Sequence, residues 1–69
     1  MVEVFKTNVQ QTKEAEELIF LLRQKFPESK INFDLDDCDK VLRVDSEENI
    51  ILPIINVLKN HNFECEELE

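Results

Sequence analysis

The 69-residue chain contains no glycine at all. Loops that cradle phosphates in Walker-type and dinucleotide-binding proteins need glycine, because its backbone turns sharply and approaches the phosphate closely. Nucleotide binding by those routes is therefore excluded. A small regulatory domain that binds its ligand through glycine-containing turns is disfavoured for the same reason.

Long apolar runs are also missing. The longest, "IILPII" at residues 50–55, is far shorter than the ~20 residues of a membrane-spanning helix. The first residues lack a basic segment followed by an apolar run, so we expect no signal peptide and no membrane contact. A cytoplasmic protein with reduced thiols is the expectation.

Basic residues are scarce, with 8 lysines and arginines against 16 acids and a net charge of −8. Acids and bases balance in residues 1–26, and the whole excess of acid lies in residues 27–69. An acidic field repels phosphate backbones, so nucleic acid is not an expected partner. The acidity also favours solubility.

Apolar periodicity predicts six elements in one domain, residues 1–69. Strands are expected at 2–7, 30–36, 40–45 and 63–68, where β-formers alternate with polar residues. Helices are expected at 12–26, capped by Thr12 and stopped by Pro27, and at about 48–60, capped by Ser46 or Asn49. Pro53 is tolerated if it falls in the first turn of the second helix.

This β-α-β-β-α-β order predicts an α+β, ferredoxin-like sandwich. Its four-stranded antiparallel sheet has strand order 4-1-3-2, and right-handed crossovers place both helices on one face. Loop 8–11, hairpin tip 36–39 and turn 60–62 then share one end. The expected core is Val4, Leu18, Leu22, Phe26, Ile31, Phe33, Leu42, Val44, Ile54, Leu58 and Phe63, with Cys65 as a small inward residue.

The length, the element order and the closing "HNFECEEL" resemble the heavy-metal-associated domains of copper chaperones and metal-pumping ATPases. The resemblance covers the whole chain and implies the fold. That family binds Cu(I) through a Cys-x-x-Cys motif after its first strand, since two soft thiolates select the ion. Here the loop reads "KTNVQQTK", and the first cysteine is Cys38. The metal ligands of the family match no position, so we expect no cofactor.

The segment "FDLDDCDK" at residues 33–40 carries four aspartates and a cysteine. This composition fits either an incomplete calcium-binding loop or the tip of a β-hairpin. The hairpin tip is favoured, because an aspartate side chain can accept a hydrogen bond from the backbone N–H two residues further along the chain. The alternative function is metal binding or transport, with copper or zinc held by Cys38, His61 and Asp36. Strand spacing places the Cys38 and His61 segments ~10 Å or more apart. Neither a catalytic pair nor an oxyanion loop is evident, so an enzyme is not expected.

The function expected first is a non-catalytic interaction module that contacts a protein partner, or a second copy, through the open sheet face. If Val2 and Val4 face the helices, Phe5 lies on that open face. The predicted interaction surface is Phe5, Val41, Arg43 and Leu68. Apolar patches with polar rims often mark contact sites, although long neighbouring side chains such as that of Arg43 can also cover them.

Overall fold

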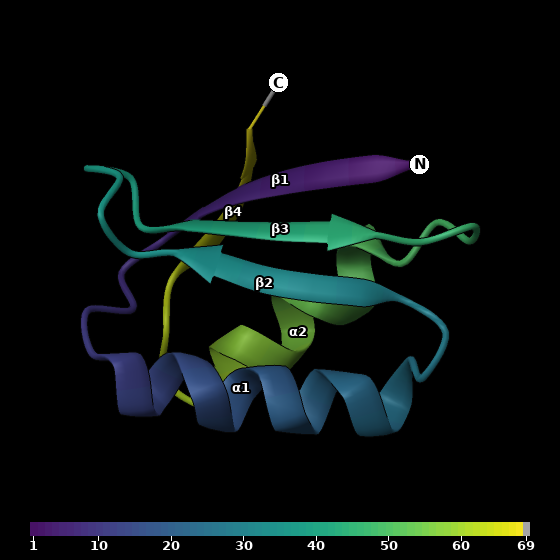
Figure 1. Ribbon diagram of the computed structural model, residues 1–69, viewed down its shortest axis with the longest axis horizontal. Helices are drawn as coiled ribbons and strands as arrows, with labels where there is room; N and C mark the ends of the chain where they lie inside the picture. The colour runs from purple at the N-terminus through teal and green to yellow at the C-terminus, as the bar shows by residue number, and fades with distance from the viewer. Residues whose placement is uncertain (69) are drawn as a thin grey trace.

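The computed structural model describes residues 1–68 and confirms the predicted element order and α+β fold (Figure 1). The four antiparallel strands follow the order β2-β3-β1-β4, which is the expected order counted from the other edge. Both helices lie below the sheet in Figure 1, and the opposite sheet face is open. The elements are β1 (Val2–Thr7), α1 (Thr12–Lys25), β2 (Lys30–Asp34), β3 (Val41–Asp45), α2 (Ile51–Asn60) and β4 (Cys65–Leu68).

Helix α1 begins one residue after Gln11, which takes the N-cap position expected for Thr12. The Gln11 backbone N–H donates to Glu14 Oε1 at 3.3 Å, which satisfies a donor at the helix start. Ala15, Leu18 and Leu22 form its buried stripe. The helix ends before Pro27, as the restricted dihedrals of a residue preceding proline predict.

Helix α2 begins at Ile51, later than the expected residue 48. Pro53 is therefore its third residue, where a backbone N–H has no intrahelical acceptor and the missing donor costs little. Ile50 takes the N-cap position expected for Ser46 or Asn49, although Asn49 Oδ1 accepts the Ile51 N–H at 3.2 Å from the preceding position. The late start is the physical reason why the proline is compatible with the helix.

The register of β1 differs from the prediction. Phe5 is 0% exposed and lies in the helix-covered core, whereas Val2 is 57% exposed and Val4 is half-buried on the opposite face. The placement of Phe5 on the open face was therefore wrong, and so was Val4 as a core residue. A phenylalanine removes more apolar area from water than a valine, so the register that buries Phe5 is favoured.

The remaining core follows the predicted faces. Phe33 packs against the core together with Phe26 and Phe63. Its inward position confirms the predicted register of β2, because a shift of one residue would have turned it to solvent. Val9 is 0% exposed and belongs to the core, although it lies in loop 8–11 and was not among the expected core residues. The other predicted core residues are all buried: Leu18, Leu22, Ile31, Leu42, Val44, Ile54, Leu58 and Cys65.

Candidate functional site

Three segments far apart in the sequence meet at the hairpin end of the sheet, as predicted. The Thr7 N–H donates to the Asp39 carbonyl at 3.0 Å, which ties the end of β1 to the hairpin tip. Asn8 Oδ1 accepts the Glu64 N–H at 2.8 Å and ties loop 8–11 to the segment before β4. A metal site of the kind found in heavy-metal-associated domains would lie at this end.

The aspartates of the hairpin tip shape the turn. Asp34 Oδ1 accepts the Asp36 N–H at 3.2 Å, and Asp37 Oδ1 accepts the Asp39 N–H at 2.8 Å. Lys40 has a positive φ of 47°, and its N–H donates to the Asp37 carbonyl at 3.0 Å. The two aspartate side-chain contacts each reach a backbone N–H two residues further on, which is the turn that the aspartate pattern predicts.

The alternative metal site of Cys38, His61 and Asp36 is not among the ligand groups that residues 1–68 bring together. Within residues 1–68, the only three metal-ligating side chains whose ligand atoms lie within 4.8 Å of one another are Asp37, Cys38 and Asp39. They are adjacent in sequence and mostly exposed. His61 instead follows the C-terminal end of α2 and lines a groove between the helices. The cause is topological, because the hairpin tip extends from β2 and β3 while α2 lies beneath the sheet.

Loop 8–11 does not fit the copper site that the resemblance would place there. The Asn8 side-chain oxygen is already an acceptor for Glu64, and Val9 is buried. The amides of Gln10 and Gln11 are hard, neutral oxygen and nitrogen donors, which are poor ligands for Cu(I). Both cysteines are free, and Cys65 is buried.

We expect the Cu(I) affinity of the protein to be no higher than that of a single exposed thiol. Cys38 is the only exposed cysteine among residues 1–68, and one thiolate on a turn does not provide the two soft ligands that hold Cu(I). Competition with a Cu(I) chelator measures this affinity, with Cys38→Ser as the matched variant. Tight stoichiometric binding that survives Cys38→Ser would contradict the expectation.

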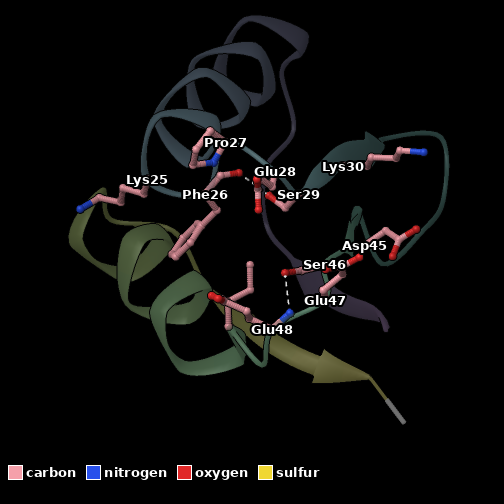
Figure 2. Close-up of a pocket in the computed structure, with 11 residues that line it drawn as sticks. Lys25, Phe26, Pro27, Glu28, Ser29, Lys30, Asp45, Ser46, Glu47 and Glu48 are labelled. Carbon is pink, nitrogen blue, oxygen red and sulfur yellow. Dashed lines mark hydrogen bonds between the residues drawn. The ribbon is translucent and has the colours of Figure 1, made fainter.

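The opposite end of the molecule carries a hollow that the sequence did not predict (Figure 2). It has a volume of about 660 Å³ and lies between the α1–β2 and β3–α2 connections. The Ser29 hydroxyl donates to the Phe26 carbonyl at 2.7 Å, and Ser46 Oγ accepts the Glu48 N–H at 3.1 Å. Its lining carries four acids (Glu28, Asp45, Glu47 and Glu48) and two lysines (Lys25 and Lys30), so the hollow disfavours an anionic ligand.

The open sheet face is built around one row that crosses three strands. Val4 on β1 pairs with Arg43 on β3 and with Leu68 on β4, so these side chains share a face. Val41 lies on the same face but is 6% exposed, which means that its neighbours already cover it. Val4 therefore occupies the central position predicted for Phe5, while Arg43 and Leu68 lie where they were expected.

The charges on this face balance. The outward positions of the four strands carry Lys6, Lys30 and Arg43 against Asp34, Asp45 and Glu66, whereas the whole chain has a net charge of −8. The Lys6 ammonium also lies 3.8 Å from Asp39 Oδ1. Among residues 1–68, this face therefore carries no excess of acid, unlike the chain as a whole.

Comparison with protein-family models, with curated proteins and with solved structures finds no match to this chain. Neither α1 nor α2 has the length and hydropathy that a bilayer crossing demands. Function therefore has to be argued from the geometry of the described residues.

Proposed function

We propose that the chain is a small cytoplasmic, non-catalytic protein-interaction module, built on a heavy-metal-associated type of fold without its metal site. The contact surface is the open sheet face, with Val4 and Arg43 on its two central strands, Leu68 on the edge strand β4 and Val2 at one margin. The partner is another protein or a second copy of this chain.

The observation that supports the proposal is the uncovered row of Val4, Arg43 and Leu68 on a charge-balanced face. Val4 and Leu68 are half-buried, and Val2 keeps 57% of its surface exposed. A transient interface typically has apolar groups at its centre and polar or charged groups around its edge. Arginine at such a centre supplies both an apolar stem and hydrogen-bond donors.

The size of the molecule sets what such a contact requires. A standard interface takes ~800 Å² from each partner, about a sixth of the 4809 Å² surface of this chain. The contact would then use most of the open face, and its centre would be fully desolvated. A charge placed at Val4 should therefore disrupt it more than a charge placed elsewhere.

We expect Val4→Glu to abolish association while the chain stays folded. A carboxylate at the centre of the contact would be desolvated without a partner, which costs more than the ~1 kcal/mol typical of surface changes. Light scattering measures self-association, and pull-down against purified binding partners measures hetero-association. Circular dichroism checks the fold.

Leu52→Glu is the matched control, because Leu52 is 70% exposed on α2 and lies away from the sheet face. It adds the same charge to a similar apolar position and should leave association unchanged. If the wild type is monomeric and Val4→Glu retains every partner, the contact surface lies elsewhere and the proposal fails.

A further inference from the structure

A second surface of the molecule has a different character from the sheet face. A groove of about 520 Å³ separates α1 from α2, within the ~300–1,000 Å³ typical of small-molecule sites. Its apolar walls come from Leu21 and Phe26 on the α1 side and from Pro53 and Val57 on α2. Figure 2 shows the Phe26 ring projecting into the space between the two helices.

The polar residues around this groove are all neutral or cationic. Lys25, Asn56, Asn60 and His61 complete the lining, and no acid among residues 1–68 belongs to it, although acids outnumber bases 16 to 8 in the chain. No hydrogen bond or ion pair within residues 1–68 engages the Lys25 ammonium or the side-chain amides of Asn56 and Asn60. These groups are therefore free donors beside an apolar wall.

The donors suit an anionic oxygen group. A lysine ammonium and a carboxamide N–H both donate to a carboxylate, and charge-assisted bonds of this kind are stronger than neutral ones. Lys25 lies in the last turn of α1, and together with Phe26 it also borders the hollow at the start of α2. That hollow is lined by four acids, so an anion is repelled there and is favoured in the groove.

We infer that the groove between α1 and α2 binds a small monocarboxylate with an apolar body. The apolar body packs against Phe26, Leu21 and Val57, and the carboxylate accepts bonds from Lys25 and a neighbouring asparagine amide. The groove lies on the helical side of the molecule, so this binding is independent of the proposed contact through the sheet.

Titration followed by NMR tests the inference on the whole chain with phenylbutyrate, phenylbutanol and phenylbutylamine, which share one apolar body and differ in charge. Phenylbutyrate should saturate with a dissociation constant on the order of 1 mM and shift the backbone amides of Leu21, Asn56 and His61. The alcohol should bind more weakly, and the amine most weakly of the three. Acetate, which lacks the apolar body, should cause no saturable shift.

The variant Lys25→Glu should weaken phenylbutyrate binding about fivefold, since a favourable ion pair becomes a repulsion. Lys13→Glu makes the same charge change on the same helix, outside the groove lining, and should change binding less than about twofold. Equal binding of the amine and the carboxylate, or equal effects of the two variants, would overturn the inference. Absence of saturation by phenylbutyrate at about 10 mM would overturn it too.

Discussion

Replacing Phe5 with alanine is expected to lower the free energy of unfolding by about 3–5 kcal/mol. Phe5 is 0% exposed and pairs with Leu42 at the centre of the sheet, so its removal leaves a cavity among fully buried side chains. A domain of this length has a total stability on the order of a few kcal/mol, so most of the variant should be unfolded at 25 °C. Urea denaturation followed by circular dichroism measures the loss.

The control is Phe20→Ala, which removes the same atoms from a side chain that is 62% exposed on α1. It should change stability by less than about 0.5 kcal/mol. Phe5→Leu keeps most of the buried volume and should remain folded, losing about 1–1.5 kcal/mol, which allows a measurement if Phe5→Ala does not fold. A Phe5→Ala variant as stable as Phe20→Ala would restore the register that places Phe5 on the open face.

The face of β1 on which Phe5 lies could not be decided from the sequence pattern alone. The segment "VEVFKT" has apolar residues at 2, 4 and 5, so both phases of the strand bury at least one of them. The phase is decided by how much area each choice buries against the helices, and Phe5 outweighs Val4 there. Strand β2 alternates without such a break. Strand β3 has a similar apolar pair, Val41 and Leu42, but Leu42 and Val44 lie on one face and outweigh Val41, and the inward faces of both strands were predicted correctly.

The element order was predictable because each boundary has a local cause. Pro27 ends α1, and the aspartates of the hairpin tip bond backbone amides within two residues. These are short-range effects that a sequence pattern carries directly. The late start of α2 was less evident, since both Ser46 and Asn49 are plausible caps and only the Asn49 side chain bonds the first helical N–H.

The candidate sites depended on tertiary arrangement and were predicted only in part. Sequence placed Cys38 and His61 at one end of the fold, but α2 carries His61 into the groove between the helices. The groove itself combines residues from α1 and α2 that are about 30 positions apart, and no local pattern joins them. The absence of acids from its lining is visible only once the helices are packed.

The buried thiol of Cys65 should be unreactive in the folded protein. Burial raises its pKa to about 12 from the ordinary 9.0, and the nearby Lys59 charge offsets only part of that rise. A thiolate is the reacting species, so at neutral pH its population falls about a thousandfold below that of an unperturbed thiol. In the Cys38→Ser variant Cys65 is the remaining cysteine, so the rate of labelling by a thiol reagent reports the reactivity of Cys65. The Cys65→Ala variant retains Cys38, and its labelling rate gives the value for an exposed thiol.

The same shift predicts how stability depends on pH. Below pH 9 the thiol is protonated in both folded and unfolded states, so its burial stabilises the fold fully. Between pH 9 and about 12 the unfolded chain releases this proton while the folded chain retains it, so stability falls as pH rises through that window. Cys65→Val keeps an apolar side chain without the proton and should lose less stability over the same range in urea denaturation. Parallel decline of the two proteins, or equal labelling rates for Cys65 and Cys38 in the native state, would show that Cys65 is not held in the core as a neutral thiol.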